Sequence, residues 1–140
     1  ARRARMTQPP RTPDGVEMLI TLLSELDGEA DWQRPSGAIV PWFMCTDAAS
    51  GVSDKITDRG IYSVHTFHPD YWTCKRYAFE ADDLIMSSAP PLAPQRRITL
   101  ADGRVAFADT VRHSLRPHRE EYSDDLERFI ARYVIELRIV

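Results

Sequence analysis

The sequence has few glycines and no long apolar run, and each shortage excludes a class of protein. Its 6 glycines are scattered singly, so none of them builds a phosphate-binding glycine loop. No apolar stretch approaches the roughly 20 residues that a helix needs to cross a bilayer. The N-terminal residues lack an apolar core segment, so we expect no secretory signal.

Cysteine and lysine are also scarce. The two cysteines, Cys45 and Cys74, have apolar neighbours, which favours two reduced, buried thiols and leaves a disulfide between them open. Lys and Arg total 18, and Lys55 and Lys75 are the lysines. With 21 acidic residues the net charge is −3, so charge does not mark the whole chain as a nucleic-acid binder.

What is present is typical of one globular domain. The 140 residues include 43% hydrophobic and 28% charged side chains, enough for a core. Residues 1–12 are expected to form a flexible basic arm, and residues 13–140 one folded domain. The arm is either solvated or in contact with phosphate or an acidic neighbour.

Two helices are predicted. The first begins at Pro13-Asp14, with Asp14 as N-cap and Glu17 three residues later, and ends at Asp27-Gly28. The second begins at Pro69-Asp70 and carries apolar residues at helical spacing to Ile85. Residues 87–94 contain three prolines, so they cannot continue that helix and predict a surface crossover.

Strands are predicted at residues 38–46, 56–67, 95–100, 105–111 and 129–140. The first is nearly all apolar, with Pro41 placing it near an edge or bulge. Asp102-Gly103 predicts a hairpin turn. Between the strands we expect a linker at 29–37, a polar loop at 47–54 and a charged irregular segment at 112–125. This order predicts an α+β fold, with a mostly antiparallel sheet of about four to five strands packed against two helices.

The last predicted strand, 129–140, has two unlike faces. Alternate residues from Phe129 to Ile139 are apolar and are expected to be buried. The other face mixes β-branched residues with Arg132, Glu136 and Arg138. A strand at this position is ordered only when it is paired, and one dry and one charged face suits a subunit of a larger assembly.

No active site emerges from the sequence. His65 and His68 are three apart in a strand and point to opposite faces, so they do not chelate together. Asp82 and Asp83 diverge on a helix and are expected on a solvated face. His113 and His118 with nearby acids leave a small hydrolase or metal enzyme as the weakest hypothesis. We expect no catalysis, no cofactor and no metal.

Several ordered features resemble one family. They are the Pro13-Asp14-Gly15-Val16-Glu17 helix start, an apolar strand with an internal proline, the Thr57–Val64 strand, the Asp102-Gly103 hairpin, Asp109–Val111 and the closing Arg128–Arg138 strand. Over residues 13–140 this set resembles the tail terminator proteins of long-tailed phages, especially those infecting actinobacteria. Residues 1–12 lie outside the shared pattern.

The resemblance implies a structural virion protein, assembled in the host cytoplasm. Its members form a hexameric ring that caps the tail tube, ends tube polymerisation and presents the head–tail joining surface. The tail tube protein lies on one side of the ring and a head-side connector or stopper on the other. Double-stranded DNA passes through the lumen without sequence-specific binding, and no membrane is involved. A stopper or head-completion ring of the phage neck is the alternative.

Ring closure requires two different complementary surfaces on each subunit. The charged face of the closing strand, with Arg132, Glu136 and Arg138, is one candidate. Either the 112–125 segment or a charged cluster is its candidate complement. That cluster is Asp54, Lys55, Asp58 and Arg59.

Overall fold

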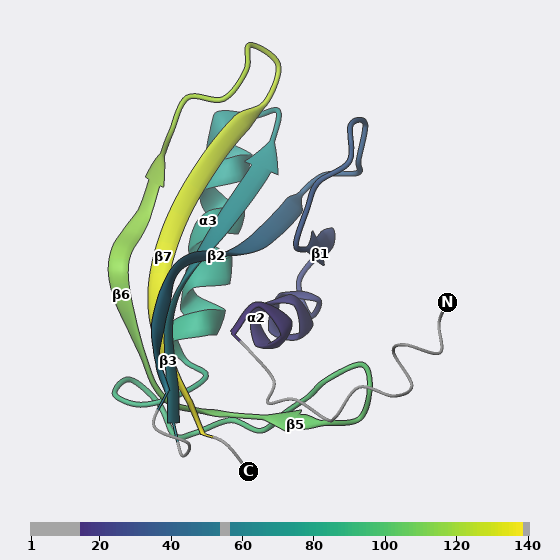
Figure 1. The fold of residues 1–140 in the computed structure, drawn as a ribbon. Coiled ribbons are helices and arrows are strands. Elements are labelled where there is room, and N and C mark those ends of the chain that lie inside the picture. The colour runs from purple at the N-terminus through teal and green to yellow at the C-terminus, as the bar shows by residue number, and fades with distance from the viewer. Residues whose placement is uncertain (1–14, 54–56, 139–140) are drawn as a thin grey trace.

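The computed structural model describes residues 15–53 and 57–138, and it has the predicted α+β architecture (Figure 1). Its elements, in order, are α2 (Gly15–Leu23), β1 (Glu29–Asp31), β2 (Trp42–Ser53), β3 (Thr57–His68), α3 (Tyr71–Met86), β4 (Ile98–Thr99), β5 (Val105–Ala106), β6 (Ala108–Arg119) and β7 (Glu127–Arg138). Five strands form one sheet in the order β1-β2-β3-β7-β6, and β4 and β5 form a small second sheet. All neighbours in the large sheet are antiparallel except β1 and β2.

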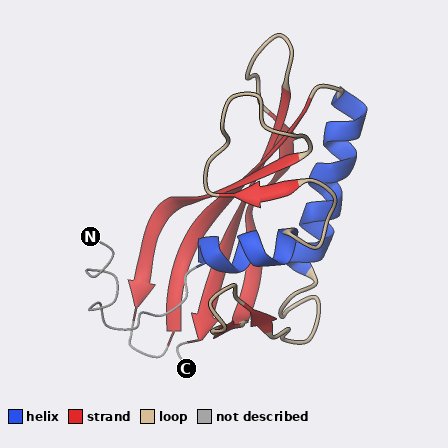
Figure 2. Cartoon of the chain, turned by 90° about the vertical axis from the view of Figure 1, so that its right-hand side faces the viewer, coloured by secondary structure: helices blue, strands red, loops and turns tan. Residues whose placement is uncertain are grey.

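Both helices cover the same face of the large sheet (Figure 2). Met18, Leu19 and Leu22 of α2 and Ile85 of α3 pack into one core with the inward residues of the strands. The fully buried side chains of the strands include Phe43, Val111, Tyr133, Ile135 and Leu137. Among residues 15–53 and 57–138, no helix covers the opposite face of the sheet.

The second helix begins where the sequence predicts. Asp70 has extended backbone angles, and its Oδ2 accepts a hydrogen bond of 2.9 Å from the Thr73 backbone N–H. This is the N-cap arrangement that satisfies an otherwise unpaired amide. The helix ends at Met86, and residues 87–97 form the crossover. Ser88 and Ala89 of this crossover are buried, so the prediction of an entirely surface segment is wrong.

The first helix is shorter than predicted. It ends at Leu23, and the amides of Glu25 and Leu26 then bond to carbonyls three residues back, at 3.2 and 3.0 Å. The residues predicted to form the last helical turn therefore form these tighter turns instead. Asp14, the predicted N-cap, lies outside the described residues. Gly28 has φ +94°, a conformation that glycine adopts without strain, and leads directly into β1.

Three predicted irregular segments contain strand. The 29–37 linker includes β1, which is parallel to β2. Strand β2 begins at Trp42, later than predicted, and continues into the expected 47–54 loop as far as Ser53, with register shifts between Asp47 and Val52. Strand β6 runs through 112–119, because its backbone bonds to β7 while its charged side chains stay outside the core.

The hairpin at Asp102-Gly103 is confirmed. Strands β4 and β5 pair antiparallel across it, and Gly103 has φ +90°. The flanking strands are only two residues each, shorter than the predicted 95–100 and 105–111 segments. After Phe107 the chain enters β6, so the second of these segments contributes to both sheets.

The closing strand is confirmed as two-faced. Strand β7 lies in the sheet between β3 and β6, and its inward residues Phe129 to Leu137 are at most 4% exposed. Arg132 and Arg138 are exposed on the other face, and Glu136 is half-buried. Ile130 also points away from the helices yet is only 4% exposed, so part of that face is covered by other segments.

Candidate assembly surface

The candidate site is the face of the sheet that carries no helix, here called the helix-free face. Strand register places Arg59 opposite Glu136, Ser63 opposite Arg132, His65 opposite Ile130 and Phe67 opposite Arg128. Alternation of side chains in a strand puts these pairs on one face. In Figure 1 this face is turned toward the viewer, with α3 behind β3 and β7.

Ion pairs within the chain occupy the half of this face near the end of β7. Glu136 Oε2 lies 2.7 Å from Arg59 Nη2, and Glu136 Oε1 accepts a 2.5 Å hydrogen bond from Thr110 Oγ1. The hydroxyl of Thr110 and the guanidinium of Arg59 together lower the pKa of Glu136. Arg138 Nη2 lies 2.9 Å from Asp109 Oδ1.

The structure therefore brings together some of the predicted interface residues and not others. Arg59, Glu136 and Arg138 share one face and are satisfied within the subunit. Asp54 and Lys55 lie outside the described residues, and Asp58 is described only by its strand pairing with Ser53 and Leu137. Sequence reasoning missed Thr110 and Asp109 as partners, because it could not tell that their strand lies beside β7; the register of β6 with β7 places Thr110 opposite Glu136.

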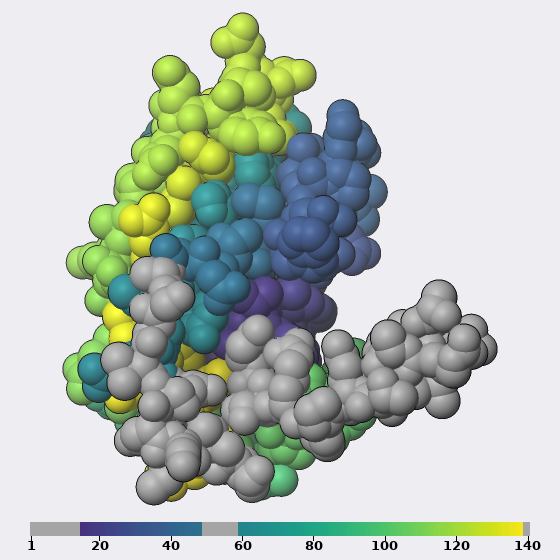
Figure 3. All heavy atoms as spheres, viewed as in Figure 1, coloured from purple at the N-terminus to yellow at the C-terminus, as the bar shows by residue number. Residues whose placement is uncertain are grey.

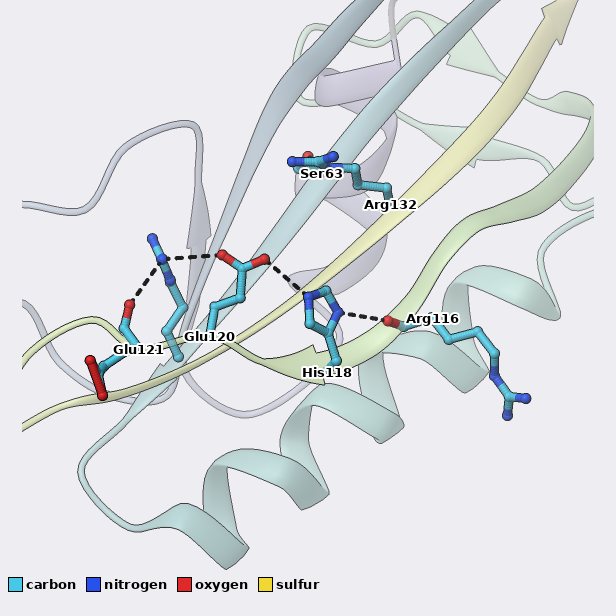
Figure 4. A network of polar contacts seen from close by, with 7 residues as sticks. Ser63, Arg116, His118, Glu120, Glu121 and Arg132 are labelled. Carbon is cyan, nitrogen blue, oxygen red and sulfur yellow. Dashed lines mark hydrogen bonds and ion pairs between the residues drawn. The ribbon is translucent and has the colours of Figure 1, made fainter.

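Arg132 lies in the other half of the face and differs from these residues. Its Nε donates to Ser63 Oγ at 3.3 Å, and no described carboxylate lies within ion-pair distance of it. The nearby carboxylate, Glu120, is engaged elsewhere (Figure 4): its Oε2 lies 3.0 Å from His118 Nε2 and its Oε1 3.6 Å from Arg128 Nη2. The bond to His118, followed by the cations around it, lowers the pKa of Glu120.

Aromatic and arginine side chains alternate beside Arg132. The Arg34 guanidinium lies 5.4 Å from the centre of the Phe67 ring, and the Tyr122 ring meets Phe67 edge-on at 5.0 Å. Arg128 in turn lies 5.1 Å from the Tyr122 ring. Such cation–π contacts hold an arginine in place without neutralising it.

Three nitrogen atoms in this cluster are buried without a hydrogen-bond partner. They are Arg34 Nε, His65 Nδ1 and Arg128 Nε, and within the described part of the chain no other buried side-chain nitrogen or oxygen is unpaired. Burial, and then the charge of Arg128, lower the pKa of His65 to about 4. Buried polar atoms are normally paired, so three together mark a place where a partner is missing.

The β6 edge of the sheet is partly covered. Gln95 Nε2 donates to the Ala108 carbonyl at 2.8 Å, and the Val111 amide donates to the Pro90 carbonyl at 3.0 Å. The rest of β6 carries register shifts and Pro117, so edge-to-edge pairing is discouraged along this strand. On the opposite side β1 pairs with β2 only at residues 42–44, and the rest of β2 has no described strand beside it there.

The histidines do not form a joint site. His113 pairs in register with Tyr133 on the inward face of β7, and its Nε2 lies 2.6 Å from Asp82 Oδ1. His118 is opposite Ile130 and contacts Glu120 on the helix-free face. Asp82 is only 9% exposed, so the prediction that it lies on a solvated face is wrong. Among residues 15–53 and 57–138, no three His, Cys, Asp or Glu side chains gather as a metal site.

The cysteines are both free and buried, which confirms the expectation of two separate thiols. Within the described part of the chain, neither helix has the length and apolar character needed to span a membrane. No family model matches the sequence, and no curated protein is significantly similar to it.

Proposed function

We propose that this chain is the repeating subunit of a hexameric ring at the head-proximal end of a phage tail. The ring caps the tail tube, ends its polymerisation and provides the surface for head–tail joining. The role is structural and requires no catalysis or cofactor. The tail tube protein and a head-side connector or stopper are its neighbours, and double-stranded DNA crosses its lumen.

The observation that carries the proposal is the asymmetry of the sheet. One face forms the core with both helices, while the other is polar, free of helices and ordered by contacts of Arg59, Arg132 and Arg138. Edge-to-edge pairing is discouraged along β6, and the exposed arginines of the helix-free face support association by that face. The assignment to a phage tail rests on the ordered sequence features from the first helix to β7.

The charge of the chain is compatible with a passage for DNA. A lumen must let DNA slide, so it cannot bind many phosphates tightly. With 21 acidic and 18 basic residues the subunit is weakly negative, and the cations at one end of the helix-free face are paired with Glu136 and Asp109.

Antiserum labelling of separated heads and tails tests the proposal. We expect label at the head-proximal end of headless tails. Label on heads with none on tails would instead identify a stopper or head-completion protein. Label on neither structure would remove the chain from the virion altogether.

A further inference from the structure

We infer that the acidic tip of the β6–β7 connection in one copy binds the Arg132 surface of the next copy. The acidic tip is Glu121, Asp124 and Asp125, and the Arg132 surface is Arg34, Ser63, His65 and Arg132 on the helix-free face. The inference rests on the proposed function, because it names the subunit contact by which a ring would close.

The Arg132 surface has cations without an ion pair among the described residues. Arg59 and Arg138 on the same face each pair with a carboxylate, at 2.7 and 2.9 Å. Arg132 bonds to the neutral Ser63 hydroxyl at 3.3 Å, and the carboxylate whose charge it influences, Glu120, is paired with His118 and Arg128. Arg34 contacts the ring of Phe67. A guanidinium offers five donors and prefers a carboxylate or phosphate, so both arginines retain most of their binding capacity.

The unpaired nitrogens single out this place among the exposed cations of the chain. Arg34 Nε and His65 Nδ1 belong to the Arg132 surface, and Arg128 Nε lies beside it, in contact with Tyr122. Lone exposed arginines elsewhere, such as Arg97, are not accompanied by buried unpaired atoms in the described part of the chain. These three atoms are buried within the subunit, so an incoming carboxylate meets the exposed side chain of Arg132 rather than these atoms.

The acidic tip carries exposed carboxylates. Residues 121–125 are all exposed, and the connection projects beyond the body of the subunit at the top of Figure 3. Asp125 Oδ1 accepts from Ser123 Oγ at 3.0 Å, and no described basic side chain lies within ion-pair distance of Glu121, Asp124 or Asp125. The charge of Glu121 acts on Arg119, which is itself paired with Glu127. Burial of such carboxylates is favourable only against a cation.

Contacts of Tyr122 and Arg128 anchor the acidic tip to the sheet. Tyr122 packs edge-on against Phe67 and under Arg128, and Arg128 Nη2 donates to the Glu121 carbonyl at 3.2 Å. This anchoring fixes the connection against the sheet while its carboxylates remain exposed. The tip and the Arg132 surface are different patches, so a head-to-tail contact between them can repeat from copy to copy, as a closed ring requires.

The experiment exchanges charges across the contact. One variant carries Arg132→Glu and another carries Asp124→Lys with Asp125→Lys; self-association is measured by light scattering over a concentration series and by binding to purified tail tubes. Each variant alone should associate at least tenfold more weakly than the unchanged chain. An equimolar mixture of the two should recover association, since one lysine tip then meets one glutamate surface.

Control variants place charge changes of the same sign elsewhere. Arg97→Glu lies in the crossover before β4 and Asp83→Lys lies on the exposed side of α3, and both should associate as the unchanged chain does. Far-ultraviolet circular dichroism and thermal melts establish that every variant is folded, because exposed charge changes leave the core intact.

The outcomes separate the contact from the function. If the unchanged chain associates and the charge variants associate equally well, the proposed contact is wrong but the proposed ring is not contradicted. The same holds if the mixture of the two variants does not recover association. If Arg132→Glu loses only retention of a short DNA duplex, the surface binds phosphate and the contact is again wrong. If the unchanged chain neither self-associates nor binds tail tubes, both the contact and the proposed function fail.

Discussion

The Tyr133 hydroxyl in β7 donates a 2.6 Å hydrogen bond to Asp82 Oδ1 in α3, which joins the helix to the middle of the sheet. Tyr133 is 1% exposed, and the same Asp82 oxygen lies 2.6 Å from His113 Nε2. One carboxylate thus links α3, β6 and β7 beneath the helix-free face. The bond fixes the orientation of α3 on the sheet.

Tyr133→Phe should therefore lower the free energy of unfolding by about 1–3 kcal/mol, because it removes a buried donor and leaves Asp82 under-satisfied. Urea unfolding measures the change. Tyr122→Phe is the matched control: Tyr122 is 50% exposed, its hydroxyl makes no described hydrogen bond, and its stability should stay within about 0.5 kcal/mol of the unchanged chain. Equal effects of the two substitutions would show that the Asp82 bond is energetically unimportant.

Tyr133 should also make the protein less stable at alkaline pH. Burial, and then the Asp82 carboxylate, raise the pKa of Tyr133 well above its usual value of 10.0. The neutral phenol is favoured in the folded state, so its contribution is complete below pH 10 and is lost as the unfolded state ionises above it. Stability should fall more steeply above pH 10 in the unchanged chain than in Tyr133→Phe.

His65 should make the free energy of unfolding vary with pH in the mildly acidic range. Burial and the neighbouring Arg128 lower its pKa from 6.5 to about 4, so the unfolded state binds a proton that the folded state rejects. The contribution is complete above pH 6.5 and declines toward pH 4, with about 1–2 kcal/mol lost between pH 7 and 5. His65→Gln should flatten this part of the profile. Titration of the His65 ring by NMR with a midpoint near 6.5 would contradict the prediction.

The two faces of β7 should respond oppositely to added charge. Ile135→Asp places a carboxylate at a position that is 0% exposed, so we expect no folded protein. Arg138→Glu loses only the partly exposed pair with Asp109, worth about 0–1 kcal/mol, and should fold normally while association weakens. Circular dichroism and light scattering measure the two effects. An unfolded Arg138→Glu chain would show that this residue serves the subunit rather than its contacts.

Both thiols should be inert in the folded protein. Burial raises the pKa of Cys74 to about 12, and burial with the charge of Asp31 raises that of Cys45. The thiolate is the reactive species, so a thiol reagent at pH 8 should label neither residue until denaturant is added. Rapid labelling of one cysteine without denaturant would show that its surroundings open readily.

Local signals in the sequence were sufficient for some elements. Asp70, an N-cap residue, predicted the start of α3. The strict alternation of apolar residues between Phe129 and Leu137 predicted β7. Both signals lie within a few residues of the structure that they predict.

Other elements depend on distant partners and could not be predicted in this way. Strand β6 is charged, contains Pro117 and has shifted register, and it is a strand because β7 supplies its hydrogen bonds. The sequence predicted Asp82 on the surface, because its hydrogen-bond partner, the Tyr133 hydroxyl, is 51 positions away in the chain. For the candidate surface, the charges of Arg132, Glu136 and Arg138 were evident, but their different pairing was not, because Ser63, Arg59 and Asp109 lie on other strands.

The particle mass of the chain bound to tail tubes tests the proposed ring most directly. Native mass spectrometry or light scattering, combined with negative-stain images of the same sample, measures how many copies sit together and where. We expect six copies at the head-proximal end of the tube. A chain that stays monomeric at every concentration and never binds a tail tube would contradict the proposal.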